Sequence, residues 1–312
     1  MIRGKNVTKM SHEEWLMARR KGIGGSDAAC ILGINPWKSA IQLYNDKVGE
    51  APLEGVDSER MRIGRDLEDY VAKRFTEATG KKVRRNNFML HYDQYPFLFA
   101  DIDRAVVGEN AILECKTTNS FSSKDWADDK IPPYYELQCM HYMLVTGAER
   151  CYIACLIGNE SFVIRTIERD DIFIQHLLNV ELNFWNNHVL AHEVPEADGS
   201  KAYSEYLSKR FPRSNEQELI LDDDSLVELL EEYDVLNKTS KKLEKDMNRI
   251  KQTIQELMGE NGIARIGKSK ATWMNQSRVS IDKDRLQEEM PEIFEQYKKV
   301  SESRVFCLSV KF

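Results

Sequence analysis

The sequence predicts an α/β fold in which helices flank a mixed central sheet, followed by a C-terminal extension of helical and α+β character. Two observations lead to this prediction. Runs with helical spacing alternate with short strand-like runs over the first 190 residues, and a polar connector then precedes a long helical seam. We therefore expect a core over residues 1–192, a connector over residues 193–215 and an extension over residues 216–312.

Two short helices are expected near the start of the chain. Ser11-His-Glu-Glu14 has the spacing of a capping box, so the first helix should begin there. Gly22-Ile-Gly-Gly25 ends this helix, and Ser26 is the predicted N-cap of the next one. Backbone N–H groups behind these glycines, with Arg19 and Arg20 nearby, would suit an anion. The same residues also fit a tight turn with a routine cap, and both interpretations stay open.

The rest of the core alternates between helices and strands. We expect helices over residues 59–79, 133–146 and 170–190, and strands over residues 81–92, 95–107, 110–118, 151–157 and 161–167. Gly80 and Gly147 are the expected stops of the first two helices. The second and third strands should form a hairpin across Gly108-Glu109-Asn110.

The extension should begin with a long helix, because apolar residues from Leu226 to Leu257 alternate spacings of three and four. This spacing is typical of a coiled coil or of a long helix packed on a partner, and Ser240 is its one interruption. Gly259 and Gly262 end the helix. A strand over residues 264–276, a helix over residues 281–300 and a strand over residues 303–312 complete the expected C-terminal module.

The composition is that of a globular cytoplasmic protein. The chain has 312 residues, of which 42% are hydrophobic and 30% are charged, so a sizeable core can form. Its six cysteines include no CxxC pair, which argues against a zinc site or a disulfide framework and predicts reduced thiols. No uncharged apolar run reaches the roughly 18 residues of a membrane span, and the start lacks a secretory signal. We expect no membrane partner.

The net charge of −7 hides an uneven distribution. Residues 1–100 hold 17 Lys and Arg against 13 Asp and Glu, which leaves +4 on this stretch and −11 on the rest. Several of the basic residues are adjacent, as in Arg19-Arg20-Lys21 and Lys81-Lys82. Such clusters can attract a polyanion despite a negative total, although part of them also fits an ordinary solvated surface.

One predicted hairpin places charged side chains within apolar runs. Glu114 and Lys116 alternate on one strand, so they face the same side while Cys115 faces the other. Asp103 lies on the preceding strand and can stand beside them. Adjacent carboxylates repel unless a proton or a cation lies between them, and Mg²⁺ prefers oxygen ligands while keeping several waters. Asp103, Glu114 and the backbone carbonyl of Cys115 are therefore candidate Mg²⁺ ligands, and Glu68 could join them.

Lys116 has two interpretations. An ammonium group beside a metal ion can lower the pKa of a bound water, orient that water, or stabilise charge on a pentavalent phosphorus. Lys116 can equally be a simple ion-pair partner of Glu114. The spacing of the residues does not separate the two.

Four motifs in order carry a resemblance to a known family. Asp103, ten further residues and Glu114-Cys-Lys116 resemble the PD-(D/E)xK nuclease core, and the surrounding elements resemble the phage lambda exonuclease family, the YqaJ-type viral recombinases. RRKGIGGSDAACILGINPW is similar to the family's Arg…Gly-Ser helix start, GRDLEDYVAKRF to its Gly-x-x-x-Glu helix, and ELQCMHYMLVTG to its glutamine-bearing helix. The resemblance covers roughly residues 10–190 and implies a restriction-endonuclease-like nuclease core.

The resemblance implies a Mg²⁺-dependent 5′→3′ exonuclease that resects the ends of double-stranded DNA to 3′ single-stranded overhangs. It further implies two metal ions, with Mn²⁺ as a substitute, a single-strand annealing recombinase as partner, and a phage or prophage protein working in the cytoplasm of a bacterial host. Homo-oligomerisation as a trimeric ring is also implied by the family.

The family's functional residues transfer by position. Glu68, Asp103 and Glu114 would hold metal, and Lys116 would act on the attacking water. Gln138 matches the glutamine that helps position that water or the scissile phosphate. The remaining matches concern the terminal 5′-phosphate, which would be bound by Arg19 and Ser26, with Arg20 as a neighbouring alternative.

The chain departs from the family pattern in two places. Family members often have Ser-Pro-Asp-Gly where this chain has Asp101-Ile-Asp-Arg104, so an acid replaces a phosphate-binding serine. The segment after residue 210 has no counterpart in the lambda enzyme, and its helical seam could build an oligomer, dock an annealing protein or fold back on itself. Two other functions also stay open: a PD-(D/E)xK endonuclease, which would cut closed circular duplex, and a DNA-end-binding recombination scaffold without catalysis.

Overall fold

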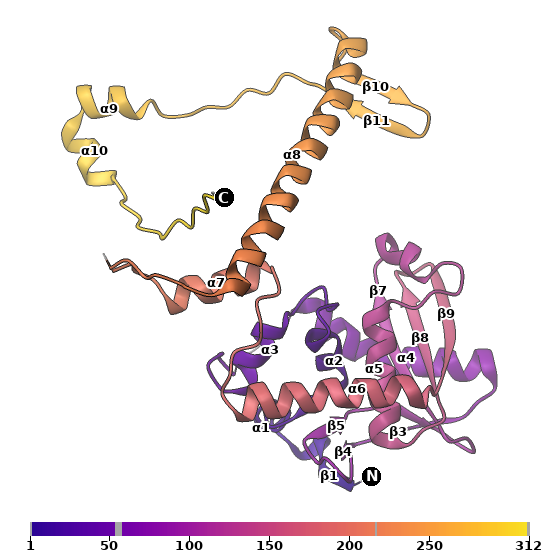
Figure 1. The fold of residues 1–312 in the computed structure, drawn as a ribbon. Helices are drawn as coiled ribbons and strands as arrows, with labels where there is room; N and C mark the ends of the chain where they lie inside the picture. The colour runs from indigo at the N-terminus through magenta and orange to yellow at the C-terminus, as the bar shows by residue number, and fades with distance from the viewer. Residues whose placement is uncertain (1, 54–57, 216, 311–312) are drawn as a thin grey trace. The chain divides into compact units, whose positions relative to one another are not determined.

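The computed structural model describes residues 2–53, 58–215 and 217–310 (Figure 1). Two compact units make up the chain, Met1–Arg210 and Phe211–Phe312. The expected connector over residues 193–215 contains a helix, α7 (Lys201–Arg210). Within the described ranges, none of the helices combines the length and the apolar character that crossing a bilayer requires.

The main sheet is mixed and has five strands in the order β3-β6-β7-β8-β9. These strands are β3 (Val83–Arg85), β6 (Arg104–Val106), β7 (Ala111–Thr118), β8 (Arg150–Ile157) and β9 (Ser161–Glu168). β7 and β8 are parallel, and every other neighbouring pair in this sheet is antiparallel. Parallel neighbours need a long crossover, which here contains helix α5 (Pro133–Thr146).

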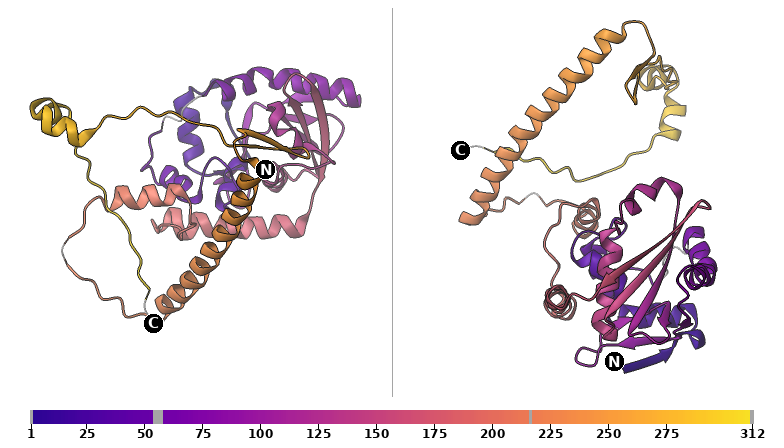
Figure 2. Two further views of the ribbon diagram at one scale, coloured as in Figure 1. Left: turned by 90° about the horizontal axis from the view of Figure 1, so that it is seen from above. Right: turned by 90° about the vertical axis from the view of Figure 1, so that its right-hand side faces the viewer.

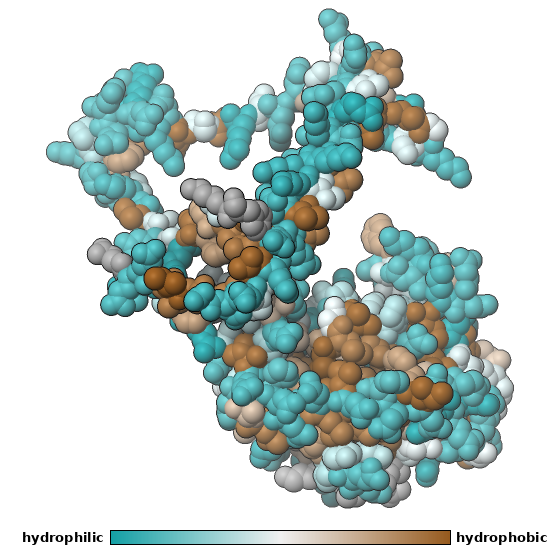
Figure 3. Space-filling model, in the orientation of Figure 1, coloured by the Kyte–Doolittle hydropathy of each residue, from teal (hydrophilic) through white to brown (hydrophobic). Residues whose placement is uncertain are grey.

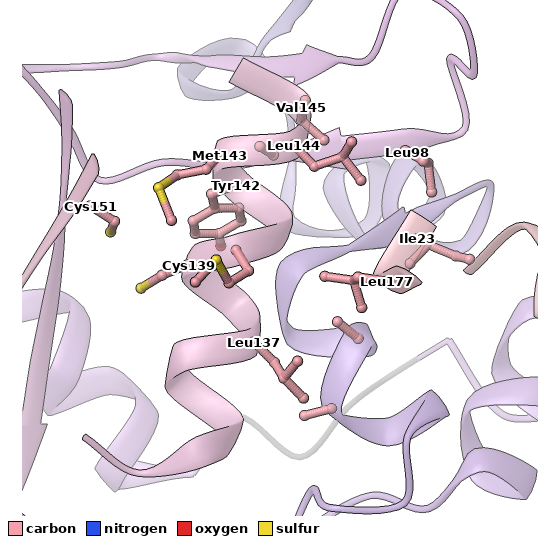
Figure 4. Close-up of a cluster of buried hydrophobic side chains, with 14 of the residues drawn as sticks. Ile23, Leu98, Leu137, Cys139, Tyr142, Met143, Leu144, Val145, Cys151 and Leu177 are labelled. Carbon is pink, nitrogen blue, oxygen red and sulfur yellow. The ribbon is translucent and has the colours of Figure 1, made fainter. Parts of the chain in front are cut away.

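Helices cover both faces of this sheet (Figure 2). On one face, Val71 and Phe75 of α4 (Glu59–Thr79) pack with Leu113 and Tyr152. On the other face, α5 packs on the opposite set of alternating strand residues. Figure 4 shows this second cluster, in which Leu137, Cys139 and Met143 of α5 are grouped with Ile23, Leu98, Cys151 and Leu177. The predicted fold class, a mixed sheet flanked by helices, is confirmed.

A smaller sheet has the strand order β1-β4-β5-β2. Its strands are β1 (Ile2–Asn6), β4 (Phe88–His91), β5 (Leu98–Ala100) and β2 (Ile23–Gly24). The runs 81–92 and 95–107, each expected to be one strand, are therefore divided between the two sheets. In the main sheet β3 pairs with β6, and in the smaller sheet β4 pairs with β5. The two runs therefore pass from one sheet to the other together, and their backbone groups stay hydrogen-bonded in both.

This division corrects the expected position of Asp103. The residue lies in the break between β5 and β6 and not on a strand, although the hairpin of β6 and β7 itself is confirmed. The register pairs Arg104 with Leu113, so the chain bends out of the sheet directly opposite Glu114.

The first two helices begin as their capping residues dictate. Helix α1 (His12–Arg20) has the predicted capping box, in which Ser11 Oγ accepts from the Glu14 N–H at 3.1 Å and the Glu14 carboxylate accepts from the Ser11 N–H at 2.8 Å. Helix α2 (Gly25–Ile31) corrects the prediction for Ser26, because Gly24 is the N-cap. The reason is Asp27, whose carboxylate accepts from the Gly24 N–H at 3.0 Å. This bond makes the helix begin at Gly25, two residues before the position that an N-cap at Ser26 would give.

Gly25 also sets how closely α2 approaches α5. A Cβ atom at this position would lie 2.5 Å from the Tyr142 ring, closer than real contacts allow. The glycines before α2 are therefore required by packing as well as by the turn.

The other helices predicted for the first unit are present, and the unit also contains helical segments that were not predicted. Gly80 and Gly147 end α4 and α5 in the left-handed conformation, as expected. The predicted helix at 170–190 is α6 (Asp171–Asn183), which continues as a π-helical segment, Phe184–Leu190. Helix α3 (Ala40–Lys47) and the 3₁₀ segments Val7–Lys9 and Ser120–Trp126 were not predicted. All six cysteines are free.

The second unit departs further from the prediction. Helix α8 (Asp224–Met258) is present as expected, but the strand expected over residues 264–276 is a hairpin of β10 (Ile263–Ile266) and β11 (Ser269–Thr272). The helix expected over residues 281–300 is two helices, α9 (Lys283–Glu289) and α10 (Pro291–Tyr297), because Pro291 holds Met290 outside helical geometry. The strand expected over residues 303–312 is not present in its described part, residues 303–310; residues 311 and 312 lie outside the described residues.

A buried ion pair connects α5, α6 and β5. His141 and Glu181 are both fully buried, and His141 Nδ1 lies 2.7 Å from Glu181 Oε1 while Nε2 lies 2.9 Å from the Phe99 carbonyl. Since a carbonyl only accepts, Nε2 carries a proton, and Nδ1 needs a second proton to face a carboxylate. Burial alone would lower the pKa of His141, but the charge of Glu181 and the hydrogen bonds to Glu181 and to the Phe99 carbonyl together outweigh burial and raise that pKa above its usual value.

This pair predicts a specific pH dependence of stability. A raised histidine pKa contributes stability that is complete below about pH 6.5, the unfolded value, and is lost as the pH rises through the folded pKa. Glu181→Gln should therefore lower the free energy of unfolding by about 3 kcal/mol at pH 6 and by clearly less at pH 9. Urea unfolding at both pH values measures this difference, with Gln175→Ala on the exposed face of α6 as control. A difference between wild type and Glu181→Gln that grows with pH would contradict the charge assignment.

Candidate active site

Asp103 and Glu114 meet where the hairpin bends. Asp103 Oδ2 accepts from the Cys115 N–H on β7 at 2.7 Å, which replaces the ladder bond that β6 no longer supplies. Burial raises the pKa of Asp103 well above its usual value, and the nearby charges of Glu114 and Glu68 raise it further. The two carboxylates are thus close enough to oppose each other's ionisation.

Glu114 is 3% exposed and is held from one side only. Its Oε1 accepts from Lys116 Nζ at 2.6 Å and from Gln138 Nε2 at 2.7 Å. Its Oε2 is buried and has no hydrogen-bond partner. Burial raises the pKa of Glu114 even though Lys116 opposes the shift. A buried carboxylate oxygen without a partner is costly, so this atom is available to a ligand that can compensate it.

Lys116 is an ammonium group with several contacts. Its Nζ also donates to Gln138 Oε1 at 3.1 Å and lies 4.7 Å from the centre of the Tyr135 ring. Burial alone would lower the pKa of Lys116, but the charges of Glu114 and Asp103, the Tyr135 hydroxyl and the hydrogen bond to Glu114 together outweigh burial and raise that pKa above its usual value. Lys116 therefore acts as a cation and a hydrogen-bond donor near neutral pH, and it is poorly suited to the role of general base.

Gln138 is positioned by α5 between the two charged residues. Besides its bonds to Glu114 and Lys116, its Nε2 donates to the Tyr142 hydroxyl at 2.9 Å. Sequence reasoning found Gln138 only through the family resemblance and missed Tyr135 and Tyr142. Their spacing of three and four around Gln138 on a predicted helix is the signal that could have found them.

Glu68 lies near this group but is engaged elsewhere. Its Oε1 accepts from the guanidinium of Arg104 and, at 3.4 Å, from Arg85. Among the residues that the structure describes, no group of three His, Cys, Asp or Glu side chains has the arrangement of a metal site. The expected three-carboxylate set is thus not assembled, because Arg104 holds the third member.

The pair that remains still suits a hard cation. Mg²⁺ in proteins is often held by one or two carboxylates and keeps several waters, and the unpartnered Glu114 Oε2 is an oxygen donor of the right kind. The N–H and C=O of one strand residue point to the same edge, so the Cys115 carbonyl is directed toward Asp103, as its N–H is. Asp103, Glu114 and this carbonyl could therefore hold Mg²⁺.

Arg19 and Ser26 are brought together as predicted. Arg19 donates to Ser26 Oγ at 3.0 Å and to Asp101 Oδ2 at 3.3 Å, and its guanidinium lies 4.8 Å from the centre of the Trp15 ring. Asp101 thus faces Arg19 and not Arg104. Burial raises the pKa of Asp101, while the charge of Arg19 opposes that shift. Trp15 was missed by sequence reasoning, although it precedes Arg19 by one helical turn.

Arg20 is not part of this cluster. It donates to the Asp46 carboxylate at 3.2 and 3.3 Å and to the Ala51 carbonyl at 2.9 Å. The two neighbouring arginines therefore have different contacts: Arg19 binds Ser26 and Asp101, whereas Arg20 connects α1 to α3 and to the segment after α3.

A buried ion pair fixes the backbone behind Arg19. Lys47 Nζ donates to Asp27 Oδ2 at 2.8 Å and to the Arg19 carbonyl at 3.0 Å. Burial would raise the pKa of Asp27, but the charges of Lys47, Arg19 and Lys38 and the hydrogen bond from Lys47 together outweigh burial and lower that pKa below its usual value. This pair joins the end of α1 to the start of α2, so it positions Arg19 and Ser26 together.

Comparisons with known proteins relate this chain to a family. The model of the YqaJ-like viral recombinase domain matches residues 14–149. The uncharacterized protein YqaJ of Bacillus subtilis (strain 168) is 40% identical over 301 residues, which cover 96% of this chain and 94% of the relative.

Two solved structures are also similar. An alkaline exonuclease from Laribacter hongkongensis has a TM-score of 0.49 and 21% identity, covering 64% of this chain and 97% of that one. A phage related exonuclease from Haemophilus somnus 129PT has a TM-score of 0.39 and 12% identity, covering 55% of this chain and 96% of that one.

The carboxylate pair predicts how stability responds to Mg²⁺. Asp103→Asn keeps an acceptor for the Cys115 N–H and removes one of two opposing charges, so it should stabilise the metal-free protein by about 1 kcal/mol. The same change should abolish the gain of about 2.7 kcal/mol that wild type shows with Mg²⁺ at 100 times its Kd. Thermal unfolding with and without Mg²⁺ measures both effects, with Glu160→Gln in the β8–β9 turn as control. A full Mg²⁺ response in Asp103→Asn would refute the ligand assignment.

Proposed function

This chain belongs to the family of YqaJ-like viral recombinases, and from that premise we propose that it is a Mg²⁺-dependent 5′→3′ exonuclease acting on double-stranded DNA ends. It leaves 3′ single-stranded overhangs, which a single-strand annealing recombinase then pairs during phage-type recombination in a bacterial cytoplasm. One observation carries the proposal: Glu114 is buried beside Asp103 with one oxygen unpartnered, while Lys116 and Gln138 hold the other.

Asp103, Glu114 and the Cys115 carbonyl are the proposed Mg²⁺ ligands, and Mn²⁺ satisfies the same oxygen donors. When bound there, the ion supplies an acidified water and stabilises negative charge on the scissile phosphate. The Cys115 N–H fixes Asp103, and Gln138 fixes the Glu114 rotamer, so both carboxylates are oriented before DNA arrives. A second ion would also need Glu68, which Arg104 would have to release.

Lys116 and Gln138 act on the phosphate and the water. Because the pKa of Lys116 is raised, its ammonium stays charged and stabilises the extra negative charge that builds up on phosphorus during attack. Gln138 can accept from the attacking water through Oε1, where it now accepts from Lys116. Tyr135 covers the ammonium on one side and limits its access to solvent.

Arg19 and Ser26 are the proposed 5′-phosphate site. Arg19 already donates to a carboxylate and a hydroxyl there, and a phosphate would replace Asp101 as the partner of the guanidinium. The site is connected to the carboxylate pair through direct contacts: Gly25 packs on Tyr142, and Tyr142 contacts Gln138. An enzyme that binds the terminal phosphate beside its metal site would act at ends.

Loss of a metal ligand should remove cleavage without removing DNA binding. Asp103→Ala and Glu114→Ala should each reduce the cleavage rate by at least about 1,000-fold, since the cation and its water carry the chemistry. The assay uses linear and closed circular duplex labelled at each terminus, with and without Mg²⁺, beside a gel-shift measurement. Glu160→Gln is the control. Wild type should release nucleotides from the 5′ end of linear DNA only; cleavage of the closed circle would favour an endonuclease, and binding without cleavage would favour a scaffold.

Arg19→Ala should selectively remove the preference for phosphorylated ends. A charge-assisted hydrogen bond contributes about 1.5–3 kcal/mol, so the rate ratio between 5′-phosphate and 5′-hydroxyl ends should fall roughly 10- to 100-fold. The adjacent Arg20→Ala is the matched control, because Asp46 and the Ala51 carbonyl bind that guanidinium. Equal slowing on both kinds of end in Arg19→Ala would count against this role.

A further inference from the structure

The second unit has an uneven charge distribution. Residues 216–234 hold nine Asp and Glu and no Lys or Arg, whereas residues 235–280 hold ten Lys and Arg against four Asp and Glu, or +6. This basic stretch covers the larger, C-terminal part of α8 and the β10–β11 hairpin. In Figure 3, hydrophilic side chains predominate along the visible side of the helix. A chain with a net charge of −7 therefore carries a basic segment outside its first unit.

Five exposed basic residues lie on one face of α8, because they recur at the spacing of a helix face. The α8 basic face consists of Lys238, Lys241, Lys242, Lys245 and Arg249. By the same periodicity, Glu244 and Asp246 lie on either side of it. Three members of the face line an open depression on the helix together with these two acids and with Asn248 and Gln252, whose amides can bond to a ligand.

The members of this face repel one another. Lys245 lies four residues from both Lys241 and Arg249, and like charges at this spacing destabilise a helix. Lys238 has an ion pair with Asp234, at 2.5 Å, whereas the other four members have no ion-pair partner among the described residues. The helix dipole favours cations only in the last turn, and this face ends at Arg249, more than two turns before α8 does. An anionic ligand would offset the repulsion.

The hairpin that follows α8 adds further cations and an aromatic ring. Arg265 pairs directly with Lys270 across the two strands, an arrangement of like charges that destabilises a sheet, and Lys268 lies in the turn between the strands. Trp273 follows β11 and is 51% exposed. Its backbone N–H donates to the Gly262 carbonyl at 2.8 Å, which holds the ring at the base of the hairpin.

These groups match the chemistry of a single nucleic-acid strand. Rows of Lys and Arg bind phosphates, and an exposed aromatic ring stacks on bases. In a duplex the bases are stacked on each other, so Trp273 finds a free base face only on a single strand. An acidic peptide would satisfy the cations but offers Trp273 no planar partner of this kind. Charge complementarity and the exposed indole therefore favour the single strand.

We propose that the α8 basic face, together with Arg265, Lys268, Lys270 and Trp273, forms a binding surface for single-stranded DNA that is separate from the site in the first unit. The cations bind phosphates, and the indole stacks on a base. The source of the strand rests on the proposed function: it is the 3′ strand that the exonuclease leaves behind. The binding itself does not depend on cleavage.

Charge reversal on α8 tests the cations. Binding of full-length protein to a labelled oligothymidylate of about 20 nucleotides is measured by fluorescence anisotropy in EDTA, which prevents metal-dependent cleavage. Combining Lys241→Glu, Lys245→Glu and Arg249→Glu should weaken binding at least about tenfold. It should also reduce the slope of log Kd against log salt by about 2, since each phosphate contact on a single strand contributes about 0.7.

The matched control has the same change in net charge elsewhere in the second unit. It combines Lys283→Glu, Lys298→Glu and Lys299→Glu, and it should bind the oligonucleotide as wild type does. Equal losses in the two triple variants would show an effect of net charge alone and would overturn the proposal. Unchanged binding in the α8 variant would overturn it as well.

Trp273 tests the choice of a single strand. Trp273→Ala should weaken binding of the oligonucleotide about tenfold, and Trp273→Phe should retain most of the affinity, because stacking needs only an aromatic face. Neither change should alter the affinity for closed circular duplex. An equal loss on the duplex would show a duplex-binding surface and overturn the proposal. Displacement of the oligonucleotide by polyglutamate as readily as by unlabelled oligonucleotide of equal charge would instead show a site for an acidic protein segment.

Cleavage assays on the same proteins separate this surface from the proposed function. Asp103→Ala should bind the oligonucleotide as tightly as wild type, because the surface lies in the other unit. A chain that does not cleave DNA but shows the losses described for the α8 and Trp273 variants would disprove the exonuclease and retain the surface. A chain that cleaves linear duplex while those variants bind the oligonucleotide like wild type would retain the exonuclease and disprove the surface.

Discussion

The structure of the first unit depends on one electrostatic constraint: Asp103 and Glu114 are held side by side in a largely apolar setting. Burial raises the pKa of both groups, the charge of Glu114 raises that of Asp103 further, and the Cys115 N–H, Lys116 and Gln138 offset only part of the cost. One Glu114 oxygen remains without a partner. A fold optimised for stability alone would not keep this arrangement, whereas a site that binds a cation and acts on phosphate needs it.

The topology explains how these groups come together. The hairpin changes from the smaller sheet to the larger one directly before Arg104, which frees Asp103 to turn toward β7. The parallel pairing of β7 and β8 requires a crossover, and α5 in that crossover places Gln138 over Glu114 and Lys116. Gly25 lets α2 contact α5 closely, so Arg19 and Ser26 are connected to the same group.

Much of this could be predicted from the sequence, because local signals determine it. The capping box at Ser11, the glycine stops of α4 and α5, and the β6–β7 hairpin all follow from short-range rules. The break at Asp103 was not predicted, because no glycine or proline lies between Ala100 and Arg104 to mark where the hairpin changes sheet. Two further features could not be predicted because they depend on side-chain contacts. Arg104 binds the Glu68 carboxylate, and Asp27 rather than Ser26 caps the start of α2. In the second unit, Pro291 was a local signal for the break between α9 and α10, and the prediction of a single helix did not take it into account.

Anomalous diffraction from crystals soaked in Mn²⁺ tests the central claim most directly, because it locates the ion without any assay of activity. We predict a single strong peak within about 2.0–2.3 Å of one oxygen each of Asp103 and Glu114, with the Cys115 carbonyl as a further neighbour. Crystals that contain Mn²⁺ elsewhere, while these two carboxylates remain bonded only to Lys116, Gln138 and the Cys115 N–H, would contradict the assignment of this hairpin as a metal site.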